Sequence, residues 1–157
     1  MVLGVKFFLM LELQIGGLGS DKSIDILRRI DTILSVHPQK AFIMVGINDI
    51  ANGSKDELFV NYVKIIEELR TNGIEVFVQS TIECSISVCG DMNALIRIHN
   101  RLLEDYCIDH GFVFVNINEQ LSTKSDGLLP QYTYDGVHLL GKGYYVWAEQ
   151  IKGILQE

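Results

Sequence analysis

The stretch AFIMVGIND, residues 41–49, decides the fold, because it joins an unbroken apolar run to a turn. The run 41–45 is bounded by Pro38 and Gly46, and an unbroken run of this length is typical of a strand that is covered on both faces. Strands of that kind belong to parallel sheets whose two faces are packed with helices. The stretch therefore indicates an α/β protein.

The segments on either side of this strand alternate between helical and extended patterns. From residue 23 to residue 36 the apolar residues recur at helical spacing, and Pro38 ends the expected helix. Ser54 is expected to cap a second helix that runs to about Thr71. The same patterns then predict strands at 74–79 and 112–115 and helices at about 92–110 and 142–155.

The N-terminal apolar run FFLML, residues 7–11, is interpreted as a further buried strand. A short signal-peptide core is the alternative, although Glu12 follows at once and no small-x-small cleavage site appears. Strands that alternate with long helices require right-handed βαβ units. We therefore expect a three-layer α/β/α sandwich with a parallel sheet, and a single domain over residues 1–157.

Composition argues against several classes of protein. The chain carries 13 Lys+Arg against 20 Asp+Glu, with no basic stripe to follow a phosphate backbone, so nucleic acid is not an expected partner. No apolar run approaches the roughly 18 residues of a membrane-spanning helix, and we expect no membrane span. Cys84, Cys89 and Cys107 contain no CxxC pair, so neither a disulfide framework nor a zinc site is expected. We expect unpaired thiols, a reducing cytoplasmic compartment, and no metal or cofactor.

In such sheets, functional residues lie beyond the carboxyl ends of the strands, and two segments there stand out. Gly46 permits a tight turn after the apolar strand, from which the Asn48 amide can project as a hydrogen-bond donor. Asp135 lies three residues before His138, a spacing that lets the carboxylate accept from one ring nitrogen and leaves the other as a general base. The alternatives are an ordinary strand-ending turn and a loop histidine capped by an acid.

A glycine-rich turn at residues 16–23 leads into the first expected helix. It matches no complete phosphate-binding pattern. Backbone N–H groups at Gly19 and Ser20 could instead face an oxyanion.

In chain order, these segments resemble conserved blocks of the SGNH, or GDSL-type, hydrolase family, and the resemblance covers residues 15–151. Residues 46–49 are similar to the third block, residues 19–23 to the second, and residues 133–139 with Gly143, Tyr144 and Trp147 to the fifth. The resemblance implies a flavodoxin-like SGNH-hydrolase fold, here with an abbreviated N-terminus. It also implies an esterase or acylhydrolase that acts on small acyl or acetyl esters, acetylated carbohydrate among them, without a cofactor.

The resemblance also assigns roles to residues. His138 would be the base, Asp135 the carboxylate that orients it, and Asn48 an oxyanion-hole donor together with an N–H of the second block at Gly19 or Ser20. Gly46 would shape the turn that presents Asn48.

The nucleophile of the family belongs to a Gly-Asp-Ser turn, and this chain contains no Asp-Ser dipeptide. Ser20 follows a strand-like run and opens a helix, which makes it the candidate nucleophile, but its place in the chain matches the second block. Ser23 is expected to cap the helix. Three explanations of the missing Gly-Asp-Ser turn stay open. The given chain starts too late, its N-terminus has been rewritten by a rearrangement, or the protein is a degenerate relative that binds without cutting.

Two other functions stay open. A ligand-binding module would keep Asn48, Asp135 and His138 without a nucleophile. An unrelated flavodoxin or response-regulator domain would need a phosphate or flavin loop, or an acidic cluster. Without the first block, the run 7–13 must fill the sheet position beside strand 41–45, or leave an open edge that invites a homodimer.

Overall fold

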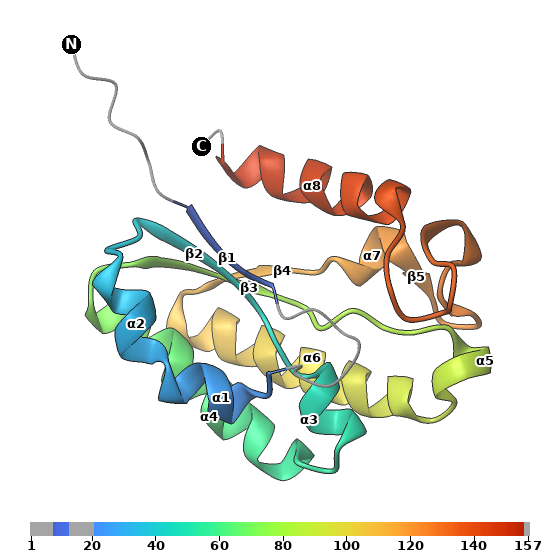
Figure 1. Ribbon diagram of the computed structural model, residues 1–157, viewed down its shortest axis with the longest axis horizontal. Helices are drawn as coiled ribbons and strands as arrows, with labels where there is room; N and C mark the ends of the chain where they lie inside the picture. The colour runs from blue at the N-terminus through green and yellow to red at the C-terminus, as the bar shows by residue number, and fades with distance from the viewer. Residues whose placement is uncertain (1–7, 13–20, 156–157) are drawn as a thin grey trace.

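The computed structural model describes the backbone of residues 8–12 and 21–155 and the side chains of residues 21–154. Within these residues the main sheet has four parallel strands in the order β1-β2-β3-β4 (Figure 1). The strands are β1 (Phe8–Glu12), β2 (Lys40–Met44), β3 (Glu75–Gln79) and β4 (Val113–Val115). The expected strands and their parallel arrangement are thus confirmed.

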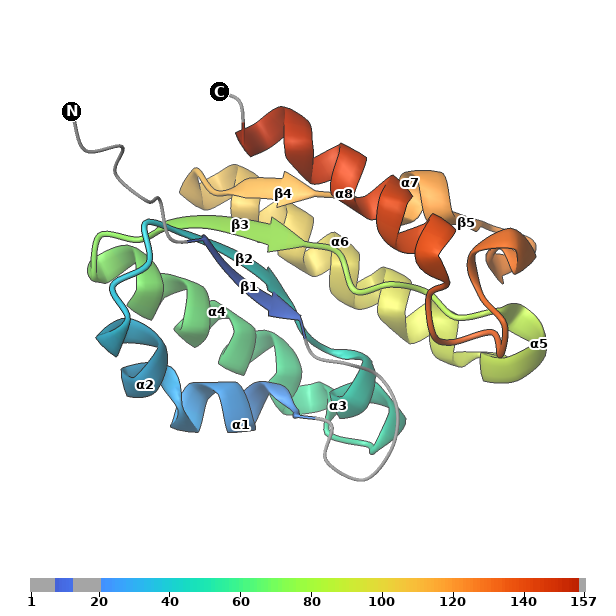
Figure 2. The ribbon, with the colours of Figure 1, turned by 45° about the horizontal axis from the view of Figure 1, so that its top comes forward.

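Helices cover both faces of this sheet (Figures 1 and 2). One face carries α1 (Ser23–Arg28), α2 (Ile30–Ser35), α4 (Lys55–Thr71) and α6 (Met92–His110). The other face carries α7 (Asn118–Leu121) and α8 (Gly141–Leu155). The expected three-layer α/β/α sandwich is therefore confirmed.

The apolar run 41–45 contributes to a hydrophobic core on each face of the sheet. Ala41, Ile43 and Val45 pack with the helices of the α4 and α6 face. Phe42 and Met44 point to the opposite face, where Phe42 stacks on Phe77 with ring centroids 4.6 Å apart. Because both faces of β2 are buried, its sequence shows no polar alternation.

Strand β1 fills the sheet position beside β2, which the sequence analysis left open. It pairs with β2 along its whole length, from Phe8 opposite Lys40 to Glu12 opposite Met44. In the described part of the chain β2 is its one neighbour in the sheet. The N-terminal run thus fills the sheet position beside β2, and a homodimer through its outer edge stays a prediction.

Several local elements differ from the expectation. The helix expected at 23–36 is interrupted at Arg29, where φ −102° and ψ 10° separate α1 from α2. Short helices form where turns or loops were expected, and a two-stranded hairpin and a 3-10 turn precede the last helix. These additional elements are α3 (Ile47–Ala51), α5 (Ile86–Cys89), β5 (Ser122–Thr123), β6 (Gly127–Leu128) and η1 (Pro130–Tyr132). No helix in the described residues is long and apolar enough to cross a bilayer.

Candidate active site

A tight loop between η1 and α8 brings Asp135 and His138 together. Oδ2 of Asp135 lies 2.5 Å from Nδ1 of His138, and Oδ1 accepts the backbone N–H groups of Val137 at 2.9 Å and His138 at 2.8 Å. Gly136 adopts φ 84°, and its N–H donates to Thr133 Oγ1 at 2.9 Å. The backbone of the loop therefore fixes the Asp135 carboxylate at Oδ1, and Oδ2 is left to hold the His138 ring.

These contacts determine the charge of the pair. The hydrogen bond from the His138 ring, followed by that from the His138 backbone, holds the pKa of Asp135 well below its usual range. An ionised carboxylate at Nδ1 favours the tautomer that carries its proton there, which leaves Nε2 of His138 as a proton acceptor. The half-buried ring is in reach of a ligand.

Tyr134 borders this pair on the solvent side. Its ring lies at 17° to the His138 ring with centroids 6.2 Å apart, and the residue is 73% exposed. An exposed aromatic face beside a candidate base is a surface on which the ring of a substrate could stack.

The second candidate segment begins at the end of β2. Gly46 adopts φ 141°, and a Cβ there would come within 2.9 Å of Thr81 Oγ1 and 3.3 Å of His99 Nε2. Only glycine fits this turn without strain. The turn starts α3 and places the Asn48 amide where Nδ2 donates to the backbone oxygen of Asp21 at 3.1 Å. An amide nitrogen carries two N–H donors, so this contact leaves a second one for a ligand.

Ser23 is part of a buried polar network. Its hydroxyl donates to Asp49 Oδ1 at 2.6 Å and accepts from Asn61 Nδ2 at 3.1 Å, and its own N–H donates to the same carboxylate. The residue is 0% exposed, and Lys22 occupies the N-cap position expected for it. The network ties α1 to α3 and α4, so Ser23 is a structural residue.

Gly19 and Ser20 lie outside the described residues. The chain becomes described at Asp21, whose carbonyl oxygen accepts from Asn48. The residue after Ser20 in the sequence is thus held beside the candidate oxyanion donor.

The segments after β2 and β3 lie side by side at the same edge of the sheet. Thr81 Oγ1 donates to the backbone oxygen of Val45 at 2.9 Å, which joins the ends of the two strands. Ser85, further along the second segment, donates its N–H to the backbone oxygen of Gly136 at 2.7 Å. The loop of Asp135 and His138 is therefore fixed to the segment that follows β3, and Asn48 lies in the segment that follows the neighbouring strand β2.

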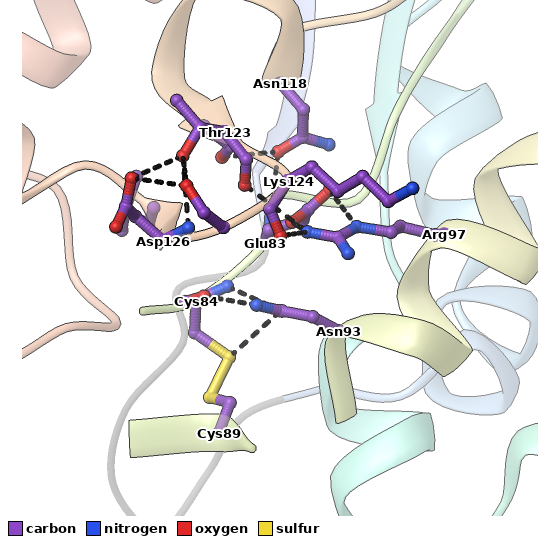
Figure 3. Close-up of polar contacts among 12 residues, drawn as sticks. Glu83, Cys84, Cys89, Asn93, Arg97, Asn118, Thr123, Lys124 and Asp126 are labelled. Carbon is purple, nitrogen blue, oxygen red and sulfur yellow. Dashed lines mark hydrogen bonds and ion pairs between the residues drawn. A yellow bond between two sulfur atoms is a disulfide. The ribbon is translucent and has the colours of Figure 1, made fainter. Parts of the chain in front are cut away.

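The cysteines correct an expectation from the sequence. Cys84 and Cys89, expected as unpaired thiols, form a disulfide, because α5 turns the chain until their Cα atoms are 6.0 Å apart (Figure 3). Their pairing removes the argument from unpaired cysteines for a reducing compartment. Cys107 is a buried thiol whose pKa burial raises to about 12. In the part of the chain described by the structure, no three His, Cys, Asp or Glu side chains gather as metal ligands.

The chain is similar to one family of enzymes in sequence and in fold. The model of the GDSL-like lipase/acylhydrolase family matches residues 5–146. A GDSL-like lipase from Bacteroides thetaiotaomicron is 27% identical, with a TM-score of 0.80 over 87% of this chain and 71% of its own. A catalytic mutant of an acetylxylan esterase from Geobacillus stearothermophilus is 18% identical, with a TM-score of 0.71 over 85% and 68%, a likeness of fold alone.

A longer relative shares the sequence over part of its length. N-acylneuraminate cytidylyltransferase of Streptococcus agalactiae serotype V is 28% identical over 135 residues. The match covers 81% of this chain and 32% of the relative, so the chain spans about a third of the curated relatives it matches. The name N-acylneuraminate cytidylyltransferase is that of the longer proteins.

Proposed function

Because the chain belongs to the GDSL-like lipase/acylhydrolase family, we propose that it hydrolyses small acyl or acetyl esters with His138 as the general base. The observation that carries this proposal is the 2.5 Å contact between Asp135 Oδ2 and His138 Nδ1. The ionised carboxylate orients the ring and stabilises the imidazolium that forms when Nε2 takes a proton from the nucleophile. When the tetrahedral intermediate collapses to the acyl-enzyme, His138 gives this proton to the leaving alcohol.

Asn48 is the proposed oxyanion donor. The tetrahedral intermediate of ester hydrolysis carries a negative oxygen, and each donor aimed at it lowers the barrier by on the order of 3 kcal/mol. Support comes from the turn at Gly46, which fixes the direction of α3, and from burial, since Asn48 is 8% exposed. A buried, fixed amide needs no reorganisation when the charge develops. A backbone N–H at Gly19 or Ser20 is the proposed second donor.

Ser20 is the proposed nucleophile of this chain. It directly precedes Asp21 in the sequence, and the Asp21 carbonyl oxygen accepts from the Asn48 amide at 3.1 Å. Ser23, by contrast, is buried and bonded to Asp49. The reaction would transfer the acyl group to Ser20 and then to water.

Acetylated carbohydrate is the proposed class of substrate. Two features support it: the shared fold with an acetylxylan esterase, and the exposed ring of Tyr134 beside His138. A sugar ring can stack on such an aromatic face while its acetyl group lies near the base.

A ligand-binding module is the second candidate function. The absence of an Asp-Ser dipeptide favours it, because a chain without a nucleophile could keep Asn48, Asp135 and His138 for binding. Such a protein would bind acetylated sugars without turning them over.

A fluorophosphonate probe distinguishes these functions. We expect one adduct per chain in the intact mass, turnover of p-nitrophenyl acetate above the buffer rate, and loss of both in Ser20→Ala. Ser125→Ala is the matched control, since Ser125 is exposed in the β5–β6 turn and should keep the adduct. An adduct on another serine would overturn the role of Ser20. No adduct and no turnover would overturn the hydrolase and favour the binding module.

A further inference from the structure

The segment between Cys84 and Cys89 lies against the loop of Asp135 and His138. The Ser85 N–H donates to the backbone oxygen of Gly136 at 2.7 Å. A Cβ at Gly136 would come within 2.5 Å of Val88 Cγ2 and 3.1 Å of Ser85 Cβ. Gly136 is the residue around which the candidate base loop turns, and both its carbonyl group and its Cα are in contact with this segment.

One end of the segment is anchored in the core. Asn93, which is 1% exposed, accepts the Cys84 N–H at Oδ1 over 3.0 Å and donates from Nδ2 to the Cys84 carbonyl oxygen at 2.5 Å (Figure 3). Leu128 of β6 also donates its N–H to that oxygen, at 3.2 Å. Cys84 is therefore fixed to both α6 and the hairpin.

The rest of the segment is held mainly at its start, where Ser85 Oγ donates to the Leu128 carbonyl oxygen at 3.0 Å and the Ile86 N–H donates to the Asp126 carbonyl oxygen at 2.8 Å. Cys89, at its far end, is only partly buried. None of the four residues of α5 is buried, and Ile86 and Val88 are 38% and 55% exposed. A helix of one turn without a buried face is not stable by itself. The disulfide adds a covalent link from Cys89, at the far end of α5, to the fixed Cys84.

We propose that the Cys84–Cys89 disulfide is a positioning element for His138 and that a dithiol reductant lowers the turnover of the enzyme by releasing α5 from Gly136. In this step a dithiol gives up two electrons and two protons. The S–S bond breaks, Cys84 and Cys89 become thiols, and the dithiol becomes a disulfide. The effect on turnover rests on the proposed function; the release of the loop does not.

The geometry explains why a small release matters. Oδ1 of Asp135 accepts the N–H groups of Val137 and His138, and this closed turn contains Gly136. A shift of the Gly136 carbonyl therefore rotates the carboxylate and the imidazole together. A misplacement of about 1 Å in a catalytic group costs on the order of 100-fold in rate, and a partial release should cost about tenfold.

Reduction of the wild-type chain with dithiothreitol tests the proposal. We expect kcat for p-nitrophenyl acetate to fall about tenfold with KM within about twofold, and the amides of Val137 and His138 to exchange with solvent about tenfold faster. The amide of Ile65, in the middle of α4, should not change. Cys89→Ser should show the reduced behaviour from the start and should not respond to dithiothreitol.

Two outcomes would overturn the proposal. One is unchanged exchange at Val137 and His138 when the intact mass shows both thiols; the other is an equal response of Cys89→Ser to the reductant. If no form of the chain turns over ester, the proposed function fails, and the exchange measurement still decides whether the disulfide holds the loop.

A pair of variants with an intact disulfide tests the contact itself. Val88→Ala removes the side chain that packs on Gly136 and should lower kcat about threefold. Ile86→Ala is the matched control, because Ile86 lies on the same helix and the atoms nearest to a Cβ at Gly136 belong to Val88 and Ser85. Equal kcat values in the two variants would show that α5 does not act through Gly136.

Discussion

Replacing His99 by phenylalanine is expected to remove a large pH dependence of folding stability. His99 lies on α6, is 5% exposed, and has its Nε2 buried without a hydrogen-bond partner among the described residues. Its ring is 5.8 Å from that of Tyr62, and Nε2 faces the turn at Gly46. Burial of the ring lowers the pKa of His99 from 6.5 to about 4.

The direction and size of this change in the free energy of unfolding follow from the protons that His99 binds in the folded and unfolded states. In the unfolded chain His99 binds a proton as the pH falls below 6.5, whereas in the folded chain it does so near 4. Between these values the unfolded state holds more protons, so the free energy of unfolding falls as the pH falls. The full loss corresponds to about 3 kcal/mol, complete below about pH 4 and absent above about pH 7.

Urea unfolding followed by the fluorescence of the single, buried Trp147 measures this effect. Between about pH 7 and pH 4, the wild-type chain should lose about 3 kcal/mol more than His99→Phe. Ile98→Ala is the matched control, since Ile98 is an exposed residue of the same helix without an ionisable group and its replacement should leave the pH profile unchanged. Parallel pH profiles for wild type and His99→Phe would refute the reasoning.

Three further substitutions test the site and its support. Gly46→Ala puts a side chain at φ 141° and 2.9 Å from Thr81 Oγ1, and should lower the free energy of unfolding by about 1–3 kcal/mol in urea; an unchanged midpoint would contradict the strain at this turn. Ser23→Ala leaves the buried Asp49 short of a donor and should cost about 1–3 kcal/mol of stability while kcat stays within about twofold; a loss of all turnover in a folded variant would instead make Ser23 the nucleophile. Asp135→Asn should reduce kcat on the order of 10⁴-fold, because the amide favours the wrong tautomer of His138, and a kcat near that of wild type in steady-state assays would count against the pair.

The sequence predicted the sheet well, because its apolar runs carry the information directly. Residues 41–45 alternate between the two cores, and a run that is apolar at every position has no solvent-facing side. The break at Arg29 could not be predicted, since the helical spacing of apolar residues continues through it.

The site was predictable where it depends on local spacing. Asp135 and His138 are three residues apart in one loop, and this spacing can be read from the sequence. The disulfide depends on the path of α5, and a separation of five residues does not indicate pairing. The position of Ser85 against Gly136 is a contact between distant segments, and no local pattern indicates it.

The burial of His99 could have been predicted from the spacing of apolar residues around it. It lies three residues after Ile96 and four before Leu103, and both of these are fully buried on α6. Residues at this spacing share one face of a helix. The pattern of the helix therefore indicates a buried histidine.

The rate of p-nitrophenyl acetate hydrolysis by His138→Ala tests most directly whether His138 acts as the base of an ester hydrolase. His37→Asn is the control: His37 is an exposed histidine with φ 47°, a conformation that asparagine tolerates. We predict that His138→Ala falls to the buffer rate while His37→Asn keeps the kcat/KM of wild type. Turnover by a folded His138→Ala at the wild-type rate would contradict the account.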